Sequence, residues 1–211
     1  METLDLTQFI TEEIAKMISV ENSLPEAGDV CDWILRKERI IYLETDVDPQ
    51  VTAIQKQILA WNKEDEGKPV EERKPIKVYI MSYGGDADCA WMLIDTLLAS
   101  KTPVYTVDVG VASSAAGIIF MAGHKRFMFK NAHVLIHEGS AQFTGDSTKV
   151  MDMTDAYKKM LKRMKEFILE RTEIPARELN KKRANDWELD AEMCIKYNVA
   201  HTIVDSLEEV L

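Results

Sequence analysis

Residues 110–123, GVASSAAGIIFMAG, form the stretch that decides the fold. The residues before it, 104–109 (VYTVDV), have the β-branched alternation of a strand, and residues 115–121 suit a buried helix. A serine therefore lies where a strand ends and a helix begins, among side chains small enough for another backbone to approach. Its hydroxyl can attack a carbonyl there while unpaired helix-terminal amides receive the oxyanion. The plainer alternative is a turn in which Ser113 or Ser114 is only an N-cap.

The composition indicates one intracellular domain, with or without an appendage. A chain of 211 residues can bury a sizeable core, and its formal net charge of −10 argues against non-specific binding to nucleic acid. Three widely spaced cysteines are typical of a reducing compartment and lack metal-type pairing, so we predict no metal and no cofactor. We see neither a signal peptide nor an apolar run of the ~20 residues that a membrane helix needs. We therefore expect a cytoplasmic protein without a membrane anchor.

Strands and helices alternate along the chain, which predicts an α/β domain with a largely parallel sheet. The expected strands are residues 39–43, 76–81, 104–109, 126–129 and 132–137. Helices are expected near residues 9–18, 30–36, 49–61, 86–100, 115–121, 146–171, 175–182 and 191–197. The charged, proline-bounded residues 62–75 are predicted to be a solvated, mobile loop.

The helix over residues 146–171 is longer than a domain of this size needs. Asp146 can cap it, and at 1.5 Å per residue it spans about 40 Å. Its apolar stripe is rich in methionine, which favours burial against another subunit. The alternative is a helix that lies across its own domain.

Four histidines are candidates for the base that would activate a serine. His124 and His201 lie in turns, and we expect both to be exposed. His133 and His137 are four apart on one predicted strand and would face the same side. His137 ends that strand, which places it at the rim of the sheet.

The orienting acid is less well defined by the sequence. Asp186 lies in a turn after a helix, beside Trp187, an aromatic able to shield it. Asp190 and Asp155 are rivals by chemistry alone, and spacing does not choose among the three. Residues 82–85 (SYGG) close a strand with two glycines whose N–H groups can approach a ligand closely.

Taken in order, these motifs resemble the ClpP family, the proteolytic subunits of the Clp protease. The family order is Ser-x-Gly-Gly, Gly-x-Ala-x-Ser, Leu-Ile-His and Asp-x-x-Leu-x-Ala, and it is followed here. Residues 34–43 (ILRKERIIYL), 94–97 (IDTL) and 125–127 (KRF) are also similar to family segments. The resemblance covers roughly residues 29–205, whereas residues 1–28 do not resemble the family's axial-loop segment.

The resemblance implies a role for five residues. Ser114 would be the nucleophile, with Ser113 as its structural neighbour. His137 would be the general base and Asp186 its orienting acid. Gly85 and Ala115 would supply the oxyanion-hole N–H groups.

The resemblance also implies a fold and an assembly. The fold would be a crotonase/ClpP-like ββα superhelix with a protruding handle helix over about 139–172. Residues 29–211 would form the peptidase domain, preceded by a divergent segment, 1–28, with an amphipathic helix. Seven-membered rings, possibly paired as a tetradecamer, would enclose the active sites, and an AAA+ unfoldase would feed them. Peptide would bind as an added strand at three residues: Asp86, Ala87 and Gly139.

The leading hypothesis is therefore a serine endopeptidase that cleaves unfolded polypeptides or short peptides inside a homo-oligomeric ring. The alternative is a catalytically idle or regulatory ClpP-like assembly subunit, which a broken triad would reveal. A relative that acts on acyl-CoA has no use for a serine nucleophile. A membrane-anchored peptidase of this fold would need an anchor.

Overall fold

The structure of the protein is a computed structural model that describes residues 27–211. The chain divides into two compact units, residues 1–37 and residues 38–211. The first described helix, α2 (Ala27–Lys37), belongs to the N-terminal unit, where the Lys37 amine lies over the Trp33 ring. The helix predicted over 9–18 lies outside the described residues, and the boundary predicted at residue 28 stays a prediction.

The described residues of the second unit form one sheet of seven strands. The strand order is β1-β2-β3-β4-β7, and these strands are all parallel. Strand β5 pairs in parallel with the end of β3, and β6 pairs antiparallel with β5. The strands are β1 (Ile40–Leu43), β2 (Ile76–Ser82), β3 (Val104–Ser113), β4 (Lys125–Phe129), β5 (His133–Ile136), β6 (Trp187–Asp190) and β7 (Thr202–Val204). This confirms the predicted α/β class and its largely parallel sheet.

Strand β3 is longer than the sequence predicts, and this extension positions the site. Its first half pairs with β4, and Val111–Ser113 then pair with β5. Between the two halves its register against β2 shifts, so that Ile80 is opposite Asp108 and Ser82 opposite Ala112. The prediction that the strand ends at residue 109 is wrong, because Gly110 interrupts the apolar alternation but not the strand.

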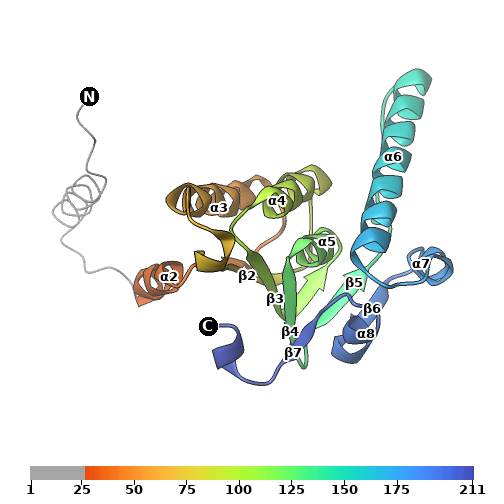
Figure 1. The fold of residues 1–211 in the computed structure, drawn as a ribbon. Coiled ribbons are helices and arrows are strands. Elements are labelled where there is room, and N and C mark those ends of the chain that lie inside the picture. The colour runs from red at the N-terminus through yellow and green to blue at the C-terminus, as the bar shows by residue number, and fades with distance from the viewer. Residues whose placement is uncertain (1–26) are drawn as a thin grey trace, which may run out of the picture. The chain divides into compact units, whose positions relative to one another are not determined.

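Helices α3, α4 and α5 lie side by side on one face of the sheet (Figure 1). Helix α5 is buried along its whole length, which matches its wholly apolar and small-residue sequence. The helices of this unit are α3 (Thr52–Glu64), α4 (Ala87–Ala99), α5 (Ala115–Ala122), α6 (Ser147–Arg171), α7 (Ala176–Lys182) and α8 (Ala191–Lys196). Across residues 27–211, none of the helices combines the length and the apolar character that crossing a bilayer requires.

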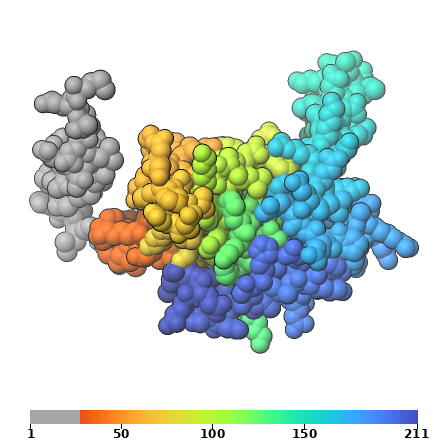
Figure 2. Space-filling view, viewed as in Figure 1, coloured from red at the N-terminus to blue at the C-terminus, as the bar shows by residue number. Residues whose placement is uncertain are grey.

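Helix α6 protrudes from the body of this unit. Asp146 caps it through the Lys149 N–H, as predicted, and its 25 residues extend about 37 Å. Only its C-terminal part is buried, at Phe167 and Ile168, and Phe167 packs edge-on against Trp91 of α4. Figure 2 shows the N-terminal part of α6, in cyan, standing clear of the rest of the surface.

Residues 62–75 are solvated, as predicted, but the segment is tied down at a buried acid. Asp65 is 1% exposed and accepts two hydrogen bonds from the Arg39 guanidinium and one from the Thr102 hydroxyl. Arg39 also donates to the carbonyl of Lys74 at the other end of the segment. No pattern in the sequence indicates this anchor, because Arg39 is 26 residues away from Asp65.

Candidate active site

Ser114 occupies a sharp corner between β3 and α5. Its backbone has φ 54° and ψ −122°, a region that residues with side chains rarely adopt. The Ser114 N–H donates to the Leu135 carbonyl of β5 at 2.9 Å, which holds the corner against the sheet. A strained strand-to-helix turn of this kind presents a hydroxyl at the end of a sheet. The predicted junction is therefore present.

His137 lies next to this serine because of the strand register. Ser113 is opposite Leu135, so His137, the first residue after β5, lies beside the Ser114 corner. The His137 Nε2 atom is 2.7 Å from the Ser114 Oγ atom, a hydrogen-bond distance. The side chain of His137 is 31% exposed, so water and substrate can reach it.

Asp186 approaches the other ring nitrogen of His137 for a similar reason. Strands β5 and β6 are antiparallel, with Ile136 opposite Trp187. His137, directly after β5, therefore faces Asp186, directly before β6. The Asp186 Oδ1 atom lies 3.4 Å from His137 Nδ1, which is longer than a normal N–H···O bond. The expected shielding by Trp187 is absent: Trp187 is buried against Tyr197, whereas the Asp186 side chain is 74% exposed.

The rival acids are engaged elsewhere. Asp190 caps α8 by accepting the Met193 N–H, and it pairs across the sheet with His133. Asp155 forms an ion pair with Lys158 on the exposed surface of α6. Of the three acids that the sequence left open, the structure brings only Asp186 close to His137.

As predicted, His124 and His201 are exposed.

The Gly84-Gly85 pair packs directly against the serine corner. Gly84 has φ +96°, and a Cβ there would lie 2.6 Å from the Ser113 carbonyl oxygen and 2.8 Å from the Ser114 Cβ. A Cβ on Gly85 would strike the backbone of Val47, with which Gly85 forms a β-bridge. Only glycine allows this approach.

Two N–H groups at this corner are available to a ligand. Within the described part of the chain, neither the Gly85 N–H nor the Ala115 N–H donates to a backbone carbonyl or to a side chain. Ala115 is the first residue of α5, where the N–H groups lack intrahelical partners. Two such donors beside one serine hydroxyl can accept a developing negative charge.

The three residues expected to bind peptide are placed differently from one another. The Asp86 N–H donates to the Val47 carbonyl at 2.6 Å, and the Asp86 carboxylate caps α4. Ala87 is the first residue of α4. Gly139 is exposed, with φ +74°, at the start of a stretch without helix or strand that leads to α6. Peptide binding at these residues stays a prediction.

One feature of the site was missed at the sequence level. Glu138, the residue after His137, forms an ion pair with Arg183 at 3.0 Å, and its N–H donates to the Arg183 carbonyl at 3.0 Å. The Tyr157 hydroxyl of α6 donates to the Glu138 carbonyl at 2.9 Å. The two Arg183 contacts fasten the strand end that carries His137 to the segment that carries Asp186, and the Tyr157 contact fastens the same strand end to α6. No sequence signal links the two charges, which are 45 residues apart.

A buried acid lies on the strand that leads to the serine. Asp108 of β3 is fully buried; one oxygen accepts the Gly110 N–H at 3.0 Å. Its Oδ2 atom has no hydrogen-bond partner among the described residues. Burial raises the pKa of Asp108 to about 7. The pKa of the Cys194 thiol is raised to about 12, mainly by burial and secondly by the nearby Asp108 carboxylate.

Comparison with known proteins identifies the family of this chain. Residues 26–207 match the family model described as Clp protease. The chain belongs to the Clp protease family. The match includes the serine corner, the histidine strand and the protruding helix, so the fold expected from the resemblance, a crotonase/ClpP-like superhelix with a handle, is confirmed.

Individual Clp protease relatives cover most of the chain. It is 29% identical over 178 residues to an ATP-dependent Clp protease proteolytic subunit of Deinococcus radiodurans, covering 83% of this chain and 84% of that protein. It is 31% identical over 180 residues to the corresponding subunit of Streptococcus mutans, covering 82% and 88%. It is 32% identical over 139 residues to proteolytic subunit 2 of Treponema denticola, covering 65% and 70%.

Proposed function

We propose that the protein is a serine endopeptidase that cleaves unfolded polypeptides or short peptides. Membership of the Clp protease family, whose relatives are named proteolytic subunits, supports a peptidase. The observation that carries the finer assignment is the 2.7 Å contact between Ser114 Oγ and His137 Nε2 at a strained strand–helix corner. Ser114 would be the nucleophile, His137 the general base and Asp186 the orienting acid.

The proposed reaction follows from the positions of these groups. His137 Nε2 takes the proton of Ser114 Oγ as the oxygen forms a bond to the peptide carbonyl carbon. The Gly85 and Ala115 N–H groups hold the resulting oxyanion. His137 then gives its proton to the departing amine as the peptide C–N bond breaks. Water then gives a proton to His137 as its oxygen forms a bond to the acyl carbon. His137 returns that proton to Ser114 Oγ as the ester C–O bond breaks, which releases the carboxylic acid product and restores the free hydroxyl.

Assembly into a closed ring is part of the proposal. Family membership implies oligomeric rings and ATPase partners in general terms. The apolar side chains on the protruding part of α6, with Met153 38% exposed, would contact a second subunit of the same chain. Residues 1–28 would be a divergent segment attached to a peptidase domain of residues 29–211, and an AAA+ unfoldase would deliver folded substrates.

Labelling with a fluorophosphonate probe, on protein sized by gel filtration, tests the nucleophile. We expect the wild type and Ser113→Ala to be labelled, and Ser114→Ala to be unlabelled and inactive on a fluorogenic peptide. Ser113 is a suitable control because it neighbours Ser114 but is buried in β3. Labelling that persists in Ser114→Ala would reject Ser114 as nucleophile. Assembled wild-type rings that are neither labelled nor active would favour the idle-subunit alternative.

A further inference from the structure

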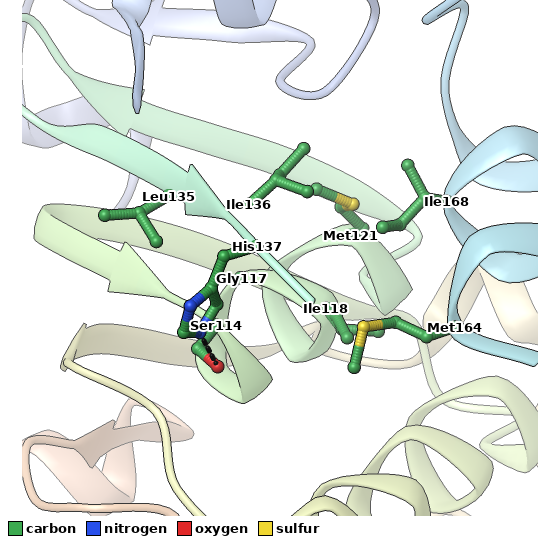
Figure 3. Close-up of a pocket in the computed structure, with 9 residues that line it drawn as sticks. All are labelled: Ser114, Gly117, Ile118, Met121, Leu135, Ile136, His137, Met164 and Ile168. Atoms are coloured by element: carbon green, nitrogen blue, oxygen red, sulfur yellow. Dashed lines mark hydrogen bonds between the residues drawn. The ribbon is translucent and has the colours of Figure 1, made fainter. Parts of the chain in front are cut away.

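The main chain leaves the sheet at His137. Ile136 is the last residue of β5 that pairs with β6, so the strand ladder does not hold the residue that follows it. Figure 3 shows the His137 ring reaching Ser114 from the end of this strand. Asp186 constrains the ring only weakly, because its side chain is 74% exposed and its carboxylate is 3.4 Å away from Nδ1. The orientation of the ring therefore depends on what holds the backbone directly after it.

Two hydrogen bonds from separate elements hold the backbone of Glu138, the next residue. The Glu138 N–H donates to the Arg183 carbonyl at 3.0 Å. The Glu138 carbonyl accepts a hydrogen bond from the Tyr157 hydroxyl of α6 at 2.9 Å. Tyr157 thus reaches the main chain one residue after His137, from the protruding helix.

The Tyr157 side chain is itself held in place. Its ring packs edge-on against Phe143, with 5.9 Å between the ring centroids. Its hydroxyl lies beside Gly139, where the chain turns with φ +74°, and a Cβ on that glycine would be 3.7 Å from the hydroxyl oxygen. The pKa of Tyr157 is raised, mainly by burial and secondly by the Glu138 carboxylate, so the hydroxyl stays a donor at neutral pH.

We propose that Tyr157 is a positioning residue of the peptidase: its hydroxyl fixes the Glu138 carbonyl and so keeps His137 Nε2 within reach of Ser114 Oγ. This inference rests on the proposed function. A hydrogen bond to the main chain one residue away limits how far the imidazole can move, and a misplacement of about 1 Å can cost about a hundredfold in rate. Tyr157 acts through the backbone rather than on the reacting atoms.

Tyr157→Phe removes this hydrogen bond and keeps the ring that packs against Phe143. With the full-length chain and one fluorogenic peptide, we expect kcat to fall about fivefold to tenfold. KM should stay within about twofold of the wild-type value, because the loss concerns the reacting groups rather than peptide binding. The rate of fluorophosphonate labelling should fall by about the same factor as kcat, since His137 must also activate Ser114 for that reaction.

The matched control is Tyr105→Phe. It makes the same change in a tyrosine of β3 that also packs against a phenylalanine, Phe127, with 5.8 Å between the ring centroids. The kcat of this control should equal that of the wild type.

A second comparison asks whether a donor at position 157 is enough. Tyr157→Lys carries an amine that can donate to the same carbonyl from a side chain of similar reach, whereas Tyr157→Met has no donor. The lysine variant should keep a kcat at least about threefold higher than that of the methionine variant, which is the size of effect that one hydrogen bond gives.

The outcomes separate this inference from the proposed function. An unchanged kcat in assembled Tyr157→Phe would overturn the inference and leave the peptidase intact, and so would a loss that Tyr105→Phe shares equally. A raised KM with an unchanged kcat would place Tyr157 in peptide binding and also overturn it. If Tyr157→Phe does not assemble, the lysine and methionine variants decide, and equal kcat values in the two would count against us. A wild type that neither cleaves the peptide nor reacts with fluorophosphonate would reject the proposed function, and this inference with it.

Discussion

The Glu138 carboxylate lies 3.0 Å from the Arg183 guanidinium, and this pair joins the two segments that carry His137 and Asp186. Glu138 directly follows His137, and Arg183 is three residues before Asp186. A displacement of either segment would change the distance between the imidazole and the carboxylate, and small misplacements of catalytic groups are costly. Under the proposed function, the ion pair would act on the reaction through the positions of His137 and Asp186.

Breaking this pair should lower activity more than stability. We expect Arg183→Met and Glu138→Gln each to reduce kcat about tenfold, with a change in unfolding free energy below about 1 kcal/mol because both side chains are partly exposed. A double-mutant cycle on kcat measures the coupling, which should be positive. A purely structural role would instead lower the melting temperature and leave kcat unchanged.

The exposed position of Asp186 predicts a graded loss of activity. Asp186→Asn should lower kcat about 10²- to 10⁴-fold, which is less than Ser114→Ala, because the acid only orients the imidazole. Asp190→Asn is the matched control: Asp190 caps α8 and is remote from the His137 ring, and asparagine keeps the cap. Steady-state kinetics on one peptide would decide. A large loss of kcat in Asp190→Asn, together with an unchanged kcat in Asp186→Asn, would identify Asp190 as the orienting acid instead.

Asp108 should make the protein less stable as the pH rises toward neutrality. Its pKa is raised from 3.8 to about 7 in the folded chain, so the folded state holds a proton that the unfolded state has lost between these pH values. The stability contributed by this proton is complete below pH 3.8 and declines by about 1.4 kcal/mol per pH unit as the pH rises to about 7.

The variant Asp108→Asn isolates this effect. It cannot ionise, so its melting temperature relative to the wild type should increase between pH 4 and pH 7 and level off above. Cys194 is the titratable group that faces Asp108 from α8, and its raised pKa keeps it neutral throughout this range. A difference between the two proteins that does not vary with pH would contradict the prediction.

The anchor of residues 62–75 should contribute strongly to stability. Asp65→Ala removes the buried carboxylate that pairs with the Arg39 guanidinium and leaves only Glu64, which is 62% exposed and 3.4 Å away. Breaking a buried pair in this way costs about 3–5 kcal/mol. The double change Arg39→Met with Asp65→Leu should cost less, because it leaves no buried charge unpaired. The partners that it releases, Glu64 and Lys68, are both exposed to water. Urea unfolding measures both. Lys158→Ala, which breaks an exposed pair with Asp155, is the control and should cost below about 1 kcal/mol. Similar losses of unfolding free energy in Asp65→Ala and Lys158→Ala would show that the buried pair contributes no more to stability than the exposed pair does.

Acid should weaken the same anchor. The Arg39 hydrogen bonds hold the pKa of Asp65 well below its usual range. The stability that this pair contributes is therefore present above the ordinary aspartate pKa of 3.8 and is lost as the pH falls below it. Asp65→Asn should remove this part of the acid dependence, as measured by urea unfolding from pH 6 to pH 2.

Local features of the fold and site were predictable from the sequence. The serine corner follows from a β-branched run next to small residues, and the protruding helix follows from apolar periodicity sustained beyond the length of a core. Asn198 has φ 52°, a left-handed conformation that asparagine tolerates better than most residues do. These features depend on neighbours within one or two turns of chain.

Features that depend on pairing between distant segments were not predictable from residue patterns alone. Residue patterns left Asp186 and Asp190 open, and the resemblance to a family named Asp186. The approach of Asp186, rather than Asp190, to His137 depends on the β5–β6 register. The burial of Asp65 and the Glu138–Arg183 pair join residues 26 and 45 positions apart. Trp187 was expected to cover Asp186, but its position in β6 turns it into the core instead.

Gly84 limits how this chain can evolve. Any other residue would need both an unfavourable φ of +96° and room where the Ser113 carbonyl and the Ser114 Cβ already lie. A substitution there would displace the main chain that carries Ser114, the proposed nucleophile, rather than a replaceable side chain. In a library of active variants, position 84 should stay glycine while its neighbour Tyr83, 72% exposed, varies widely. The tolerance of adjacent positions to mutation thus differs sharply within a single turn.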